Sequence, residues 1–102
     1  YTLSLHDALP IYMKIIRINA MWCSGCIVMK SRWRKIEKMY DGITYIDYDL
    51  DMDEHEVTKY NVKDVVPVYI FLDNDDNILK RIDGEVSKTE IINSIEEFND
   101  EV

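Results

Sequence analysis

The chain has 102 residues, which is enough for one compact domain and too few for two. Twenty acidic and twelve basic residues give it a net charge of −8, and this argues against nucleic acid as a partner because phosphates would repel such a surface. No apolar run approaches the roughly 20 residues that span a bilayer, so we expect no membrane-spanning segment.

The first 12 residues fit poorly with the pattern that follows them. They have no basic start, and His6, Asp7 and Pro10 interrupt any apolar core, so they do not read as a signal peptide. Met13 stands directly before a clean strand pattern, and residues 3–11 resemble a translated sequencing-adapter read-through. We expect residues 1–12 to be a non-native extension and residues 13–102 to be the domain; a genuine extension is the alternative.

The domain begins with an expected strand and a long helix. Residues 14–20 are rich in isoleucine and predict a strand that is buried on at least one face. Residues 24–40 predict a helix, because apolar side chains mostly recur at three- and four-residue spacing. Asp41 and Gly42 should end it, since glycine suits a left-handed stop. The apolar positions of this helix are Cys26, Val28, Met29, Trp33, Ile36 and Met39.

Two shorter elements follow. Residues 43–49 alternate between apolar and polar side chains, which predicts a strand. Residues 51–60 predict a short helix with Asp51 or Asp53 as its cap.

The last third of the chain predicts a hairpin. Residues 65–72 form the most hydrophobic run and should be a strand. Residues 73–77 are a dense turn signal, and residues 78–82 should pair back on the preceding strand. Gly84 then interrupts the pattern.

A final helix begins after Ser87, and Glu90 stands three residues on, as in a capping box. The predicted order is therefore β-α-β-α-β-β-α in one α/β domain. The apolar side of the final helix consists of Ile91, Ile92, Ile95 and Phe98.

Cys23 and Cys26 are the only cysteines, and they stand at the expected strand-to-helix junction. A bridge between them closes so small a loop that it adds little stability, which leaves redox or metal chemistry. The helix start lowers the pKa of the first thiol and favours redox chemistry. Zinc needs four ligands, and His6 and His55 are the only histidines, so we expect no metal within one chain; a cluster shared between two chains is the alternative.

Several motifs together resemble the thioredoxin family. Trp22 and the Cys-x-x-Cys pair follow the first strand, the Val66–Pro67 junction comes about forty residues later, and Gly84 follows a hairpin and precedes the last helix. The resemblance covers nearly all of residues 13–102. It implies a thioredoxin-like fold, with a central mixed sheet flanked by helices.

The resemblance also implies roles for the two thiols. Cys23 would be the exposed nucleophile and Cys26 the buried resolving thiol. Cys23 would attack a partner's disulfide, and Cys26 would then release the reduced partner. Substrates would be protein or small disulfides, a separate reductase would regenerate the dithiol, and no cofactor beyond the disulfide would be needed.

Four further residues receive a role from the resemblance. Pro67 would be cis and would face the cysteine pair, which leaves the backbone of Val66 free to pair with an extended substrate segment. A proline inside a strand needs such an explanation, because it forfeits a ladder hydrogen bond. Trp22 would shield the disulfide and contact partners, and Gly84 would leave room for substrate.

The chain departs from the family pattern at residues that influence the redox potential and the protonation of the two thiols. Ser24 and Gly25 replace the usual Gly-Pro, so the redox potential cannot be carried over. Arg17 and Asp47 occupy positions where a buried Asp and a Lys are common, with the charges reversed. Our hypothesis is that they pair beneath the active site, with Asp47 as the base for Cys26; the alternative is that Arg17 faces solvent and Asp47 pairs with a surface lysine.

We therefore predict a thiol–disulfide oxidoreductase that reduces protein disulfides in the cytoplasm. The alternatives are a thioredoxin-fold binding or adaptor module without turnover, and a glutaredoxin-like protein.

Overall fold

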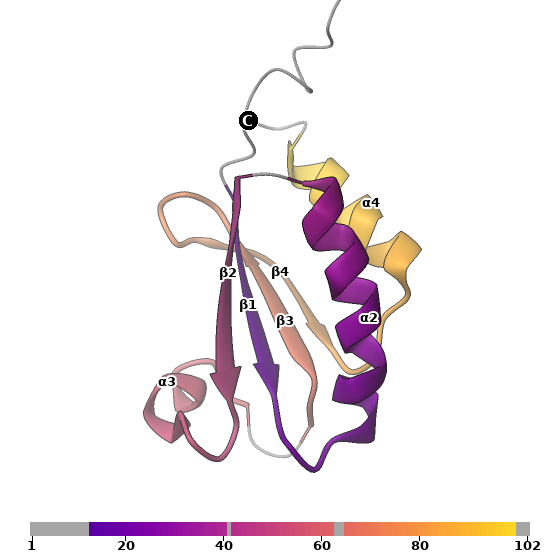
Figure 1. Ribbon diagram of the computed structural model, residues 1–102. Coiled ribbons are helices and arrows are strands. Elements are labelled where there is room, and N and C mark those ends of the chain that lie inside the picture. Colours follow the sequence, from indigo (N-terminus) through magenta and orange to yellow (C-terminus); the bar gives the residue numbers. More distant parts are fainter. Residues whose placement is uncertain (1–12, 41, 63–64, 100–102) are drawn as a thin grey trace, which may run out of the picture.

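A computed structural model describes residues 13–40, 42–62 and 65–99. The expected extension at residues 1–12 lies outside the described residues, so its origin stays a prediction. The elements follow the predicted β-α-β-α-β-β-α order (Figure 1). They are β1 (Met13–Asn19), α2 (Ser24–Met39), β2 (Ile43–Asp49), α3 (Glu54–Thr58), β3 (Val68–Leu72), β4 (Ile78–Asp83) and α4 (Lys88–Asn99).

The four strands form one mixed sheet in the order β2-β1-β3-β4. β1 runs parallel to β2 and antiparallel to β3, and β4 completes the antiparallel hairpin. The parallel register pairs Met13 with Ile43 and Arg17 with Asp47. β1 is thus an inner strand, and its end delivers the chain directly into α2.

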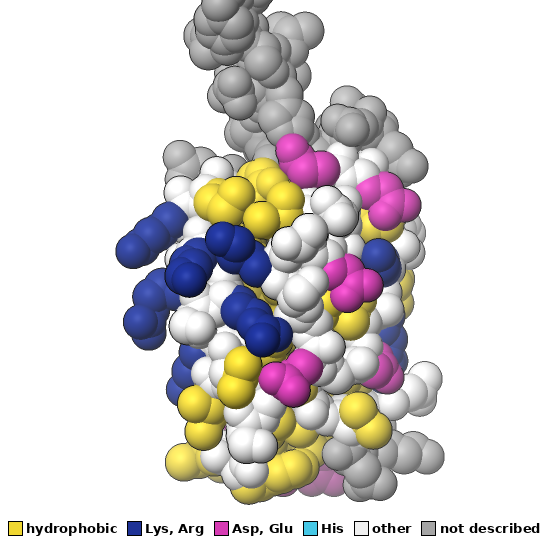
Figure 2. Space-filling view, turned by 90° about the vertical axis from the view of Figure 1, so that its right-hand side faces the viewer, with side chains coloured by type: hydrophobic (Ala, Val, Ile, Leu, Met, Phe, Trp, Pro, Cys, Tyr) yellow, Lys and Arg dark blue, Asp and Glu magenta, His cyan; other side chains and the backbone are white. Residues whose placement is uncertain are grey.

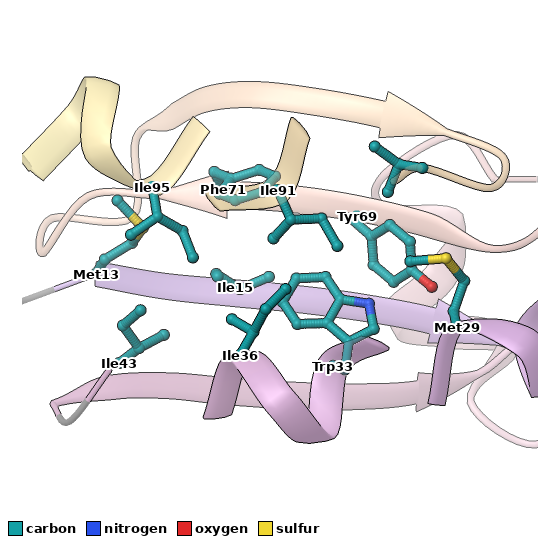
Figure 3. Close-up of a cluster of buried hydrophobic side chains, with 11 residues drawn as sticks. Met13, Ile15, Met29, Trp33, Ile36, Ile43, Tyr69, Phe71, Ile91 and Ile95 are labelled. Carbon is teal, nitrogen blue, oxygen red and sulfur yellow. The ribbon is translucent and has the colours of Figure 1, made fainter. Parts of the chain in front are cut away.

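Helices cover both faces of the sheet, with α2 and α4 on one face and α3 on the other (Figure 1). Alternation along β1 and β3 divides their side chains between two cores. Ile15 and Phe71 pack toward α2 and α4, where Trp33 and Ile36 meet them (Figure 3). The opposite core contains Ile16, Ile18, Val57, Val62, Val68, Ile70 and Leu72.

Two elements differ from the sequence prediction by more than one residue at an end. The short helix covers only Glu54–Thr58, because the Asp49 carboxylate accepts hydrogen bonds from the backbone N–H groups of Asp51 and Met52 and holds that segment in a turn. β3 begins at Val68 rather than at residue 65. Pro67 has no N–H to donate to a ladder, so pairing starts after it.

Candidate functional site

The two cysteines lie where β1 passes into α2. Cys23 is the N-cap of α2 in extended conformation, and its sulfur accepts a hydrogen bond from the Cys26 backbone N–H at 3.1 Å. The Cys23 N–H donates to the Ala20 carbonyl at 3.2 Å and closes the turn before the helix. The two residues are joined by a disulfide with their Cα atoms 5.3 Å apart. This position places the Cys23 sulfur among the unpaired N–H groups of a helix start, which stabilise a thiolate.

Both cysteines are buried in the disulfide form. Cys23 is 6% exposed and Cys26 is 3% exposed, in a small apolar cluster that Leu50 and Val66 cover in part. The expectation of an exposed Cys23 is therefore wrong for this oxidised state. Cys23 is the slightly more exposed of the two.

Pro67 lies against the cysteine pair, and the Val66–Pro67 peptide bond is cis. The Val66 carbonyl oxygen is 3.6 Å from the Cys23 sulfur. A Cβ atom at Gly25 would lie 3.7 Å from the Pro67 ring, so the first turn of α2 also lies close to this loop. The structure thus brings Val66 and Pro67 to the disulfide, as the resemblance implied, while their use by substrate stays a prediction.

Gly84, directly after β4, holds the loop that contains Pro67 by a backbone hydrogen bond. Its N–H donates to the Pro67 carbonyl at 2.7 Å, and its φ of 98° lies in the region that favours glycine. A Cβ atom there would have no neighbour within 4 Å. Backbone conformation, rather than contact within this chain, therefore requires the glycine, and the space in front of it is open.

Exposed apolar side chains flank the disulfide. Trp22 is 62% exposed, and its indole N–H donates to the Asp51 carboxylate at 3.0 Å, which fixes the ring beside the β2–α3 turn. Sequence reasoning identified Trp22 but missed its neighbours, because lone apolar residues beside a motif do not show whether they face water. We call this set the apolar rim; it consists of Met21, Trp22, Ile27, Val28 and Val65.

Arg17 and Asp47 form the pair that the sequence hypothesis required. Arg17 Nε is 2.6 Å from Asp47 Oδ1 and Nη2 is 2.9 Å from Oδ2, which makes a two-pronged contact between neighbouring strands. Arg17 Nη1 also donates to Glu37 of α2 at 2.9 Å. The alternative in which Arg17 faces solvent is wrong, because its side chain is only 11% exposed. Sequence reasoning missed Glu37, since only the packing of α2 on the sheet brings it here.

Aromatic rings complete the surroundings of Arg17. Its guanidinium lies 4.5 Å from the ring centre of Tyr45 and 5.3 Å from that of Trp33. Burial alone would lower the pKa of Arg17, but the hydrogen bonds to Asp47 and Glu37 outweigh it and raise that pKa. Arg17 therefore remains a fixed cation on the α2 side of the sheet.

A cavity of about 430 Å³ joins this pair to Cys26. Cys26, Arg17 and Asp47 all line it, together with Trp33 and Tyr69. The rings of Trp33 and Tyr69 lie side by side with their centres 5.0 Å apart (Figure 3). Within the described part of the chain, neither the Trp33 indole N–H nor the Tyr69 hydroxyl makes a hydrogen bond of normal geometry. Burial raises the pKa of Tyr69 to about 12, so this phenol stays protonated near neutral pH. The arrangement gives Cys26 polar neighbours across the cavity.

Among residues 13–40, 42–62 and 65–99, no three His, Cys, Asp or Glu side chains come together as a group that could hold a metal ion, and His55 is an exposed residue of α3. His6 lies outside the described residues. No helix in those ranges combines the length and the apolar character needed to cross a membrane.

Comparison with known proteins gave consistent matches along the chain. The family model described as Thioredoxin matches residues 10–97. Thioredoxin H5 of Oryza sativa subsp. japonica is 27% identical over 70 residues, which are 69% of this chain and 51% of that protein. Thioredoxin-1 of Caenorhabditis elegans is 31% identical over 64 residues, which are 63% of this chain and 55% of that protein. The chain thus spans about half the length of the curated relatives it matches.

Solved structures of thioredoxins are also similar to this chain. A structure of thioredoxin-2 from a malaria parasite, described as a component of the protein secretion machinery, superposes with a TM-score of 0.77 at 30% identity and covers 83% of this chain and 82% of that one. The thioredoxin pre-protein of Schistosoma mansoni gives a TM-score of 0.75 at 22% identity over 92% of this chain and 86% of that one, which supports the fold alone.

Proposed function

This chain belongs to the thioredoxin family, and we propose that it reduces protein disulfides by exchange with its own Cys23–Cys26 couple. The observation that carries the proposal is the placement of the Cys23 sulfur at the N-cap of α2, where the Cys26 N–H donates to it at 3.1 Å. That hydrogen bond and the helix start favour a Cys23 thiolate once the disulfide is reduced.

The proposed reaction has two exchange steps. The Cys23 thiolate attacks one sulfur of the partner's disulfide, forms a mixed disulfide and expels the partner's other sulfur as a thiolate. Cys26 then loses its proton and attacks Cys23, which reforms the Cys23–Cys26 disulfide and releases the partner's second thiolate. Two electrons thus pass to the partner, and a separate reductase must return two electrons to the chain. We propose the cytoplasm as the setting, because thiols are kept reduced there.

The surroundings of the disulfide support an extended protein segment as substrate. The Val66 carbonyl lies beside the Cys23 sulfur, and β3 begins only at Val68, so the backbone at Val66 is not used by the sheet. The apolar rim offers side chains against which a segment can pack, and the space before Gly84 is open. Backbone pairing with apolar side contacts is a general mode of peptide recognition.

We further propose that Asp47 takes the proton that Cys26 releases. Asp47 and Cys26 line one cavity, and Arg17 holds the carboxylate in place on two of its nitrogens. The Asp47→Asn variant tests this role, with the pH-dependence of turnover as the readout. We expect the pH-dependence of the second step, the attack of Cys26 on the mixed disulfide at Cys23, to change in this variant. An unchanged pH profile would exclude Asp47 as the base.

Insulin reduction with dithiothreitol tests the proposed function as a whole. We expect wild-type protein to accelerate the precipitation of insulin chains and Cys23→Ser to abolish the acceleration. Circular dichroism on Cys23→Ser controls for folding. A folded wild-type protein without activity would favour the adaptor alternative, in which the apolar rim grips a partner and the disulfide does not turn over.

A further inference from the structure

The outer face of α2 carries a run of unpaired cations. We call it the basic α2 face; it consists of Lys30, Arg34, Lys35 and Lys38, all of them exposed. None of the four makes a hydrogen bond or an ion pair with another described residue, whereas Arg32, on the inner side, donates to the Val86 carbonyl. Figure 2 shows Lys and Arg side chains gathered on one side of this face of the molecule, above hydrophobic side chains at its lower end.

The local charge of this face is opposite to that of the whole chain. The net charge of the chain is −8, yet the one acidic residue of α2, Glu37, is engaged by Arg17. On the other side of Trp22, the β2–α3 segment is acidic and Asp51 holds the indole. The disulfide therefore lies between a basic side and an acidic side, so a docking protein meets opposite charges on the two sides.

We propose that the basic α2 face docks protein substrates whose reducible disulfide is flanked by carboxylates. This inference rests on the proposed function and names the substrate class for the same site. The four cations lead away from the active site along α2, and Ile27 and Val28 of the apolar rim begin the same exposed side of the helix. Lys30, Arg34 and Lys38 recur at four-residue spacing, which aligns them on one ridge.

The distances between these charges and Cys23 along the α2 axis indicate how the charges can act. At about 1.5 Å per residue, Lys30 lies about 10 Å along the axis from Cys23, and Lys38 lies about 22 Å away. Charges farther apart than about 8 Å are largely screened at physiological salt. Lys38 is therefore too distant to tune the Cys23 thiol, whereas Lys30 and Arg34 line the cavity that contains Cys26 and Asp47. The docking role of the basic α2 face, by contact with carboxylates of a partner or by steering its approach, is for this reason read from the ratio of rates between peptides rather than from the rates themselves.

Peptide disulfides of equal length provide the test, with the cystine flanked by Glu, by Lys or by Ser. The rate constant kcat/KM is measured with dithiothreitol as the recycling reductant, at about 50 mM and 200 mM NaCl. We expect wild-type protein to prefer the Glu peptide over the Lys peptide about tenfold at the lower salt, a ratio equivalent to about 1.4 kcal/mol. The preference should shrink at the higher salt, because exposed charges are screened.

Two double variants test whether the preference for the Glu peptide depends on the basic α2 face. Lys30→Glu/Arg34→Glu should invert the preference, and glutamate keeps the helix propensity of α2. Lys14→Glu/Lys59→Glu changes the net charge by the same four units and is the control for the overall charge, since these lysines lie on β1 and beyond α3; it should keep the wild-type ratio. A shift in redox potential would change the rates with all peptides together, so the ratio isolates docking.

The outcomes separate this inference from the proposed function. A wild-type ratio near one, or a ratio that Lys30→Glu/Arg34→Glu leaves unchanged, overturns the docking inference while reduction of the Ser peptide sustains the proposed function. If the ratio is near one and phosphatidylserine vesicles bind wild type but not the variant, the basic α2 face serves a lipid surface instead, and the inference also fails. No reduction of any peptide would overturn both.

Discussion

The ion pair between β1 and β2 makes Arg17 the most informative stability variant. Arg17→Met keeps a long side chain over Trp33 and removes the charge. The substitution removes two ion pairs and two ring contacts at once, whereas Asp47→Asn removes only one ion pair and leaves Arg17 bound to Glu37. The two variants should therefore differ in a defined way.

The magnitude follows from the exposure of the partners. Asp47 is 58% exposed and Glu37 is 44% exposed, so both carboxylates rehydrate when Arg17 is lost, and each pair contributes only about 0.5 kcal/mol. The two ring contacts add about 0.5 kcal/mol each. We expect Arg17→Met to lower the free energy of unfolding by about 2 kcal/mol, and Asp47→Asn by about 0.5 kcal/mol. For a domain of this size these losses correspond to about 12 °C and about 3 °C in Tm.

Urea and thermal unfolding followed by circular dichroism measure both values. The destabilisation caused by Asp47→Asn should disappear in 1 M NaCl because salt screens the ion pair, while about half of that caused by Arg17→Met, the part due to the ring contacts, persists. The reasoning is refuted if Asp47→Asn destabilises the chain as much as Arg17→Met, or if Arg17→Met has no effect at either salt concentration.

Two other positions give separate predictions. Gly84→Ala should cost about 1 kcal/mol of unfolding free energy from its φ of 98°, without steric clash, and a loss above about 3 kcal/mol in urea unfolding would contradict the open space seen there. Tyr69→Phe removes a buried hydroxyl without a partner in the described part of the chain, so stability at pH 7 should stay equal or rise by up to about 1 kcal/mol. Burial raises the pKa of Tyr69 from 10.0 to about 12, so between these values the unfolded state loses the proton that the folded state keeps, and wild-type stability falls with rising pH. The Phe variant should fall less steeply between pH 10 and pH 12; an equally steep fall would show that Tyr69 does not carry the effect.

The sequence predicted most of the fold because the patterns were local. Residues 43–49 largely alternate between apolar and polar side chains and form β2 with the predicted bounds, and Ser87 caps α4 by accepting from the Glu90 N–H at 3.1 Å. The start of β3 was not predictable from hydrophobicity, because Val65 is as apolar as the strand but is exposed beside the disulfide.

The site was predictable where it depends on motif spacing or strand register. Arg17 and Asp47 meet because parallel pairing places them side by side. Glu37 and Tyr69 could not be found this way, since their positions follow from how α2 packs on the sheet and how β3 pairs with β1. The burial of Cys23 also depends on the side chains of Leu50 and Val66, which are distant in sequence.

The central claim is that Cys23 attacks first and Cys26 resolves. Mass spectrometry of the reduced Cys26→Ser variant, mixed with an excess of a peptide disulfide, tests it most directly, with Cys23→Ser as the matched control. We predict that Cys26→Ser accumulates a stable mixed disulfide of one peptide chain at Cys23 and that Cys23→Ser accumulates little, because Cys26 is the more deeply buried thiol and lies inside α2. Equal trapping by both variants, or trapping at Cys26 alone, would contradict the account.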